Sequence, residues 1–279
     1  MVTLPAVAIL GAGSMGGAIL SGLLSPDVSV DGGIRVTNRT EAKAAALRSD
    51  GVASFSTEAD PRANLAAVSG AGIVLAAVKP AMIPDLLREV GAGLDPDAIV
   101  VSVAAGVTTA TMEALLPESV AVLRAMPNTP AVVGRAVTGL SAGSRSTAEQ
   151  LALATTLFET VGTVVVVPEE RIDALSTISG SGPAYVFYLI EQLTKTAIGL
   201  GFSEVEAATL VNTTFLGASE LLEASGATPE ELRRQVTSPK GTTERAIAEL
   251  ESADLKALFD RATAAALARA LELAGESAG

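Results

Sequence analysis

The segment at residues 7–20, VAILGAGSMGGAIL, joins a short aliphatic run to a glycine-rich stretch with the spacing G-x-G-x-x-G. In this pattern Gly11 permits a tight turn, Gly13 lets the backbone approach a pyrophosphate, and Gly16 allows a helix to pack closely on a strand. The segment therefore predicts the first strand and helix of a dinucleotide-binding domain. The alternative is an ordinary structural turn that arises by chance in an Ala- and Gly-rich chain. The motif residues predicted to contact the cofactor are Gly11, Ala12, Gly13, Ser14, Met15 and Gly16.

Residues 1–166 alternate short Val- and Ile-rich runs with helical stretches, as expected for a parallel sheet that is buried on both faces. The pattern predicts an α/β fold: an N-terminal Rossmann-type, doubly wound, mostly parallel sheet. Strands are predicted at 7–10, 34–38, 72–78, 98–103, 120–126, 136–142 and 163–167, with helices at 40–49, 81–91 and 146–160.

The strand pattern stops after about residue 168, and capping boxes at Ser203/Glu206 and Thr228/Glu231 predict helices. The segment at 184–201 is apolar on nearly every side over its first two turns, which predicts that a second chain covers it. We therefore predict two domains: residues 1–166, a dinucleotide-binding Rossmann domain, and residues 167–279, an all-helical domain that dimerises.

Charge and composition exclude several classes of protein. A net charge of −12 argues against nucleic-acid binding, and the absence of Cys and His removes thiolate chemistry, catalytic triads and the usual ligands of transition metals. No metal site is predicted. The N-terminus lacks the basic region of a signal peptide, and no apolar run is long enough to span a membrane. The predicted location is the cytoplasm, without a membrane partner.

The end of the second predicted strand indicates which cofactor is used. NAD-preferring domains carry an Asp or Glu there, whereas this chain has Asn38, Arg39 and Thr40, with no carboxylate before Glu41. Because a guanidinium suits a 2′-phosphate in charge and geometry, Asn38 and Arg39 predict NADPH, with NADH possible. The alternative places Arg39 in a solvated loop.

Other candidate cofactor contacts follow from the strand pattern, because ligands of open α/β sheets bind beyond the carboxyl ends of the strands. The strand at 72–78 ends in AVKP and the strand at 98–103 leads into VAAG. Taken alone, Lys79 is better explained as an ordinary surface lysine. The residues at these two ends are Ala77, Val78, Lys79, Pro80, Val103 and Ala105.

The segment at 236–251, VTSPKGTTERAIAELE, interrupts a helical region with a Pro- and Gly-containing turn and then begins a new helix at Thr242 and Thr243. The first amides of a helix lack partners within that helix and form a ready site for an anion. The turn therefore predicts a binding site for a carboxylate. The alternative is an ordinary helix cap in which a threonine is the cap residue.

Taken together, GAGSMG, AVKP, VSVAAGVT, MPNTP, SGSGPAY and VTSPKGTTERAIAELE resemble the pyrroline-5-carboxylate reductase family over the whole chain. The resemblance implies a Rossmann domain, a helical dimerisation domain and NADPH-dependent reduction of L-1-pyrroline-5-carboxylate to L-proline in amino-acid biosynthesis. It also implies a homodimer, with a decamer as a possible higher assembly, and an active site between the 238–243 loop and the Rossmann domain.

The family pattern assigns roles to individual residues. The substrate carboxylate is expected on the amides around Ser238, Gly241 and Thr242, and the Thr243 hydroxyl at the ring nitrogen. Cofactor contacts are expected from Asn64, Ala77, Lys79 and Ala105. Many relatives have Gly-Gly where this chain has Lys240-Gly241, and the extra ammonium either assists an anionic substrate or lies in solvent. The segment at 180–183 either lines the site or shapes the entry to the following helix.

Two other kinds of protein share this layout. A 3-hydroxy-acid dehydrogenase, like a related imine reductase, combines a Rossmann domain with helices, and its chemistry calls for a lysine, for which Lys195 is the best candidate. A non-catalytic NADP sensor is the second alternative, but it gives the 238–243 loop no role.

Overall fold

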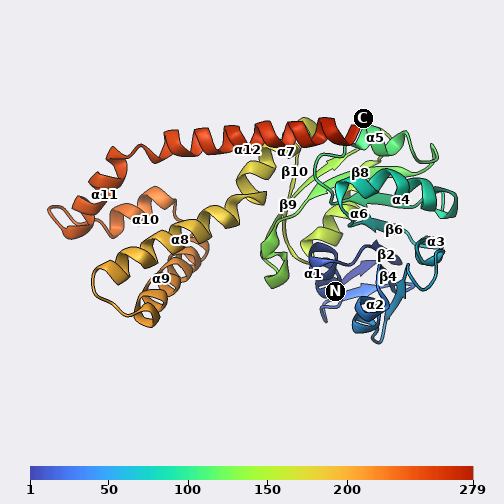
Figure 1. Cartoon of the computed structure of the whole chain (residues 1–279), viewed down its shortest axis with the longest axis horizontal. Helices are drawn as coiled ribbons and strands as arrows, with labels where there is room; N and C mark the ends of the chain where they lie inside the picture. Colours follow the sequence, from blue (N-terminus) through green and yellow to red (C-terminus); the bar gives the residue numbers. More distant parts are fainter. Residues whose placement is uncertain (279) are drawn as a thin grey trace. The chain divides into compact units, whose positions relative to one another are not determined.

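The computed structural model describes residues 1–278 and divides the chain into two compact units (Figure 1). The first unit contains residues 1–181 and the chain from residue 266 onward, and the second contains residues 182–265. This division does not coincide with the predicted boundary at 166/167, because short helices that follow the last strand pack against the sheet. As a functional boundary, residue 166 stays a prediction.

Eight strands of the first unit form one sheet in the order β10-β9-β8-β7-β6-β2-β4-β5. All neighbouring strands are parallel except β8 and β9, which confirms the predicted doubly wound, mostly parallel sheet. The chain runs outward from β2 in one direction and then returns to β6 on its other side, so the switch point of the topology lies at β2. The strands are β2 (Val7–Leu10), β4 (Ile34–Asn38), β5 (Val52–Ser56), β6 (Ile73–Ala76), β7 (Ile99–Ser102), β8 (Ala121–Met126), β9 (Ala136–Ala142) and β10 (Gly162–Val166).

The seven predicted strands are all present, and the largest difference at an end is the strand predicted at 72–78, which stops at Ala76. Three strands were not predicted. Strand β5 alternates apolar residues with small polar ones, and its Ser54 and Ser56 are buried, so its hydrophobic signal is weak. Strands β1 (Val2–Leu4) and β3 (Val28–Val30) are three residues each and form a separate small parallel pair.

Helices cover both faces of the sheet, and two hydrophobic clusters separate the helices from the strands. Successive residues of β2 point to opposite faces, so Ile9 belongs to one cluster and Leu10 to the other. The first cluster packs under α1 (Ser14–Leu23), α2 (Glu41–Leu47) and α6 (Ala148–Glu159), and the second under α3 (Ala63–Val68), α4 (Ile83–Val90) and α5 (Thr109–Glu113). Every residue of β2, β6 and β7 is buried, as expected for central parallel strands.

The rest of the chain is helical, with α7 (Ile172–Leu175), a π-helical turn (Ser176–Gly180), α8 (Gly182–Gly199), α9 (Glu204–Ser225), α10 (Pro229–Gln235), α11 (Thr242–Ser252) and α12 (Leu255–Ala278). Both predicted capping boxes are confirmed. Ser203 begins α9 and exchanges hydrogen bonds with Glu206, and Thr228 begins α10 and does the same with Glu231. These bonds hold the pKa of both glutamates below its usual range.

Helix α8 leaves large apolar side chains uncovered. No residue of α8 is buried, and the exposed fractions of Phe187 and Tyr188 reach 66% and 61%. Helices α8 and α9 pack side by side within their unit (Figure 1). None of the helices within residues 1–278 combines the length and the apolar character that crossing a bilayer requires.

Candidate active site

The glycine motif has the geometry that its spacing predicts. Gly11 has a φ of 87°, and a Cβ atom there would lie 2.7 Å from Val78 Cγ1, so the tight turn requires glycine. Gly16 lies directly against the turn and β2, because its Cβ would meet the Gly11 carbonyl oxygen at 3.0 Å and Ile9 Cγ2 at 3.1 Å. A Cβ at Gly13 would meet no atom within 4 Å, so this part of the backbone is open to a ligand.

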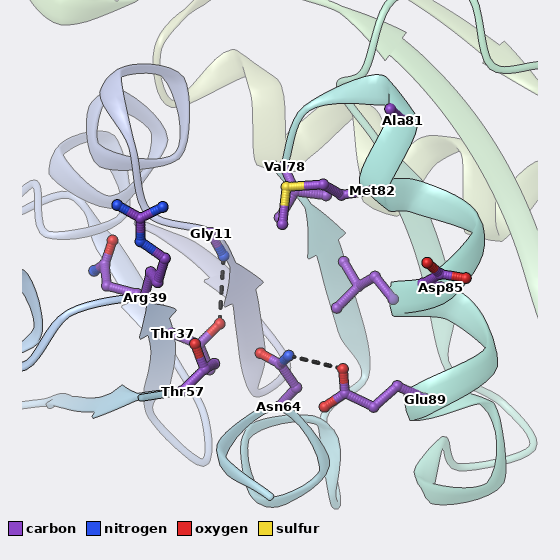
Figure 2. A pocket seen from close by; sticks show the side chains of 12 residues that line it. Gly11, Thr37, Arg39, Thr57, Asn64, Val78, Ala81, Met82, Asp85 and Glu89 are labelled. Carbon is purple, nitrogen blue, oxygen red and sulfur yellow. Dashed lines mark hydrogen bonds between the residues drawn. The ribbon is translucent and has the colours of Figure 1, made fainter. Parts of the chain in front are cut away.

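A cavity of about 440 Å³ opens beside this turn, beyond the carboxyl ends of β2, β4 and β6 (Figure 2). The Gly11 amide donates to the Thr37 carbonyl oxygen at 3.1 Å and to Thr37 Oγ1 at 3.3 Å, which fixes the turn against the end of β4. Five residues predicted to bind the cofactor meet here: Gly11, Asn38, Arg39, Asn64 and Val78. The other residues that line the cavity are Thr37, Thr57, Ala81, Met82, Asp85, Leu86 and Glu89.

Arg39 stands at one side of this cavity with its side chain 83% exposed (Figure 2). Its Nε lies 3.5 Å from the Glu58 carboxylate, a partner that the sequence pattern did not reveal. Glu58 follows β5, which pairs with β4, so the overlooked strand brings this carboxylate beside Arg39. A correct prediction of β5 would have placed Glu58 near Arg39.

Asn64 reaches the cavity from α3 and is oriented by α4. Its Nδ2 donates to Glu89 Oε2 at 3.2 Å, and Figure 2 shows the two side chains facing each other. Because the amide nitrogen is directed to Glu89, the Asn64 Oδ1 atom is left as an acceptor at the cavity.

A second cavity of about 820 Å³ lies in the same unit, beyond the ends of β6 and β7. It contains three more of the predicted cofactor residues, Lys79, Pro80 and Ala105. Three further predicted residues, Met15, Ala77 and Val103, pack against the hydrophobic cluster beneath α1. The two cavities thus share the segment at residues 78–82 at the end of β6.

A buried ion pair supports the floor of the second cavity. Arg124 on β8 is 2% exposed and pairs with Asp173 at 2.6 Å and with Glu169 at 3.7 Å. The Glu169 carboxylate also accepts hydrogen bonds from the Thr109 amide and hydroxyl at 2.7 and 2.5 Å. Since Asp173 lines the cavity, this network fixes its edge. Sequence reasoning missed these residues because their partners lie far apart in the chain.

The Pro-flanked loop after β8 owes its position to Asn128, which is buried. Its Oδ1 accepts from the Val137 amide at 2.9 Å, and its Nδ2 donates to the Ser179 carbonyl oxygen at 2.8 Å. The same π-helical turn, Ser176–Gly180, leads directly into α8, whose second residue is Pro183. The segment at 180–183 thus joins this turn to α8, and its two predicted roles, lining the site or shaping the entry to the helix, both stay predictions.

The loop before α11 has the free amides that its sequence predicts, with one difference. The Gly241 amide donates to the Ser238 carbonyl oxygen at 3.0 Å, so it is used inside the turn. Within residues 1–278 the amides of Ser238, Thr242 and Thr243 have no intramolecular acceptor. Gly241, and not Thr243, is the N-cap of α11.

Residue 240 has a backbone conformation that suits glycine. Lys240 has a φ of 60°, in the left-handed region that costs an ordinary residue about 1 kcal/mol or more. Its amide donates to Glu244 Oε2 at 2.9 Å, which holds the turn in place. The Lys240 side chain is exposed, and the role of its ammonium stays a prediction.

Lys195, the catalytic candidate of the alternative interpretation, is an exposed residue of α8. Its ammonium is hydrogen-bonded to Glu191 one turn earlier, and this pairing holds the pKa of Glu191 below its usual range. The lysine is explained as half of a surface ion pair.

Comparisons with known proteins agree with this geometry. A family model described as pyrroline-5-carboxylate reductase dimerisation matches residues 169–273, and one described as NADP oxidoreductase coenzyme F420-dependent matches residues 6–106. A pyrroline-5-carboxylate reductase from Pseudomonas aeruginosa is 36% identical over 271 residues, which is 97% of each chain. A solved pyrroline-5-carboxylate reductase from Coxiella burnetii superposes with a TM-score of 0.88 at 36% identity, covering 96% of this chain and 97% of that one.

The similarity extends over both compact units. A pyrroline-5-carboxylate reductase from Corynebacterium melassecola is 38% identical over 271 residues, covering 96% of this chain and 98% of that protein. Such identity along the whole length confirms the resemblance seen in the motifs, and the chain belongs to the pyrroline-5-carboxylate reductase family.

Proposed function

We propose that this protein reduces L-1-pyrroline-5-carboxylate to L-proline with NADPH, the last step of proline biosynthesis. The observation that carries the proposal is the 38% identity to a pyrroline-5-carboxylate reductase along 96% of the chain, which spans both the cofactor half and the helical half. A 3-hydroxy-acid dehydrogenase is disfavoured, because the lysine that it would need is paired with Glu191 on the surface of α8.

The residues of the first unit suit a dinucleotide. The open backbone at Gly13 and the start of α1 at Ser14 offer amides to a pyrophosphate, and Arg39 offers a guanidinium to a 2′-phosphate. NADPH supplies the hydride when it is bound, and NADH is the other possible donor. Ala77, Lys79 and Ala105 are the proposed contacts at the nicotinamide end.

The loop before α11 suits the substrate carboxylate. Its free amides at Ser238, Thr242 and Thr243 stand at the positive end of an 11-residue helix, which favours an anion. The Thr243 hydroxyl is the proposed partner of the ring nitrogen, and Thr243 is the candidate catalytic residue. The loop amides and the Thr243 hydroxyl orient the substrate, and neither transfers a proton to it.

The absence of histidine from the chain fits an imine substrate. When a protonated cyclic imine accepts a hydride at carbon, the electrons of the C=N bond pass to nitrogen, and the product is a neutral amine. No proton donor is needed in this step, whereas reduction of a ketone builds negative charge on oxygen and requires one. Positioning of the imine carbon supplies much of the rate enhancement.

We expect the purified protein to oxidise NADPH in the presence of pyrroline-5-carboxylate and to form proline. The measurement is the loss of absorbance of the reduced nicotinamide, with proline identified as product and NADH compared at equal concentration. The same assay is run in reverse with 3-hydroxy acids and NADP⁺. Turnover of 3-hydroxy acids would contradict the proposal, and so would NADPH binding without turnover of the imine, which is the behaviour of a sensor.

We also propose a homodimer that forms through the helical unit. The support is the match to a dimerisation family over residues 169–273 and the uncovered apolar surface of α8, where Phe187 and Tyr188 are 66% and 61% exposed. Sedimentation at micromolar concentration should give the mass of two chains or of a multiple of two, such as a decamer. A folded monomer under these conditions would contradict this assembly.

A further inference from the structure

Glu58 stands beside Arg39 because two backbone hydrogen bonds extend the pairing of β4 and β5 past the ends of both strands. The Thr57 amide donates to the Asn38 carbonyl oxygen at 2.9 Å, and the Glu58 amide donates to the Arg39 carbonyl oxygen at 3.0 Å. The Ser56 hydroxyl adds a third bond, at 3.0 Å, to the Arg39 carbonyl oxygen. The position of Glu58 is thus fixed by the backbone, whatever its side chain contacts.

The carboxylate itself is held loosely. It lies 3.5 Å from Arg39 Nε, and the two side chains are 59% and 83% exposed. Exposed ion pairs of this kind are weak and screened by salt, so a ligand displaces them readily. The contact is made to Nε, which leaves the two terminal nitrogens of the guanidinium fork for a phosphate.

Glu41, the carboxylate nearest to Arg39 in sequence, is already engaged. It accepts a hydrogen bond from Arg48 Nη1 at 2.7 Å, and the same arginine donates to the Ser54 carbonyl oxygen. Neither Glu41 nor Glu58 lines the cavity itself, but Glu58 directly follows Thr57, which does, and it contacts Arg39, which also does. Of these two carboxylates, Glu58 is therefore the one held beside the guanidinium of Arg39 at the edge of the cavity.

We propose that Glu58 sets the cofactor selectivity of this enzyme by opposing Arg39. In NAD-binding Rossmann domains an acidic side chain near the end of the second strand accepts a hydrogen bond from the ribose 2′-hydroxyl. Glu58 comes from the adjacent strand β5, but its backbone is bonded to Arg39 at the end of β4, so it can take the same role. The same carboxylate repels the 2′-phosphate of NADPH and occupies part of the guanidinium that would bind it. Arg39 and Glu58 thus favour different cofactors, and the protein binds both. This inference rests on the proposed function, which assigns Arg39 to the 2′-phosphate of NADPH.

The alternative role for Glu58 is to orient Arg39 toward the 2′-phosphate. This role predicts the opposite change in the ratio of the NADH to the NADPH dissociation constant. If Glu58 opposes Arg39, Glu58→Gln and Glu58→Ala bind NADPH more tightly and NADH more weakly than the wild type. We expect the ratio of the NADH to the NADPH dissociation constant to rise about 5- to 20-fold, the scale of one screened interaction with a charged group. If Glu58 only orients Arg39, the ratio falls in both variants.

The experiment titrates each cofactor directly, by nicotinamide fluorescence, into wild type, Glu58→Gln, Glu58→Ala and the matched control Glu41→Gln. The control removes the same charge from a neighbouring carboxylate that is bound to Arg48, and its ratio should equal that of the wild type. Repeating the titrations at high salt should diminish the gain in NADPH affinity that the Glu58 variants show over the wild type. An unchanged or lower ratio in the Glu58 variants overturns the proposal.

Binding is measured without substrate, so this result is separate from the activity itself. Failure of the wild type to reduce pyrroline-5-carboxylate refutes the proposed function while the binding ratio still decides the role of Glu58. Reduction of the imine with an unchanged ratio refutes the role of Glu58 alone.

Discussion

Arg39→Ala should raise the KM for NADPH well above tenfold while leaving the KM for NADH nearly unchanged. The guanidinium is exposed at the cofactor cavity, and its terminal nitrogens are free of the Glu58 contact, which is made through Nε. Charge-assisted hydrogen bonds are worth about 1.5–3 kcal/mol, or about 10- to 150-fold in affinity. Steady-state kinetics with each cofactor, at saturating imine, measure both constants.

The control for this variant is Lys43→Ala, which removes one positive charge from an exposed position of the neighbouring helix α2. It should leave both KM values unchanged, because a general electrostatic effect on an anionic cofactor is small at physiological salt. Equal increases for NADPH and NADH in Arg39→Ala would show that the arginine acts on the fold of the cavity and not on the 2′-phosphate.

Thr243→Ala should lower kcat/KM for pyrroline-5-carboxylate by about 10- to 100-fold, the scale of one hydrogen bond to a partly charged partner. The substitution deletes the hydroxyl and keeps the amides of Ser238, Thr242 and Thr243, so capture of the carboxylate should largely survive. Thr243→Ser should recover most of the loss. The measurement is kcat/KM together with the melting temperature of each variant.

The matched control is Thr228→Ala, which removes a threonine that does cap a helix. Thr228 begins α10 and accepts from the Glu231 amide, so its loss should cost about 1 kcal/mol of stability and leave kcat/KM unchanged. Thr243 is the second residue of α11, whose N-cap is Gly241, so its variants should melt near the wild type. A less stable Thr243→Ala enzyme with unchanged kcat/KM would contradict the proposed contact with the substrate.

The sheet was predictable because its central strands are buried on both faces and are therefore apolar throughout. Strands β2, β6 and β7 stand out in the sequence for this reason, and the glycine spacing after β2 identifies the turn that follows it. The edge strand β5 was missed because Ser54 and Ser56 break the apolar pattern even though both are buried. Because β5 was not predicted, the position of Glu58 beside Arg39 was not predicted either.

The helical half was predictable where local chemistry begins a helix, as at Ser203 and Thr228. What the pattern did not settle was which amides of the 238–243 loop are free. That depends on the left-handed conformation of Lys240 and on the bond from the Gly241 amide to Ser238. Likewise, the ion pairs of Arg124 join residues 45 or more positions apart, and no local pattern marks them.

The two side-chain hydrogen bonds of Asn128 limit which amino acids can replace it. Its side chain offers an acceptor to Val137 and a donor to Ser179 at the same time, 2.9 and 2.8 Å away, in a buried place. Aspartate has the same shape but lacks the donor, leucine has neither group, and glutamine has both on a stem that is one methylene longer. Few other side chains combine both functions in so small a volume. Deamidation of this one residue would therefore set two oxygens against each other at Ser179 and loosen the entry to α8.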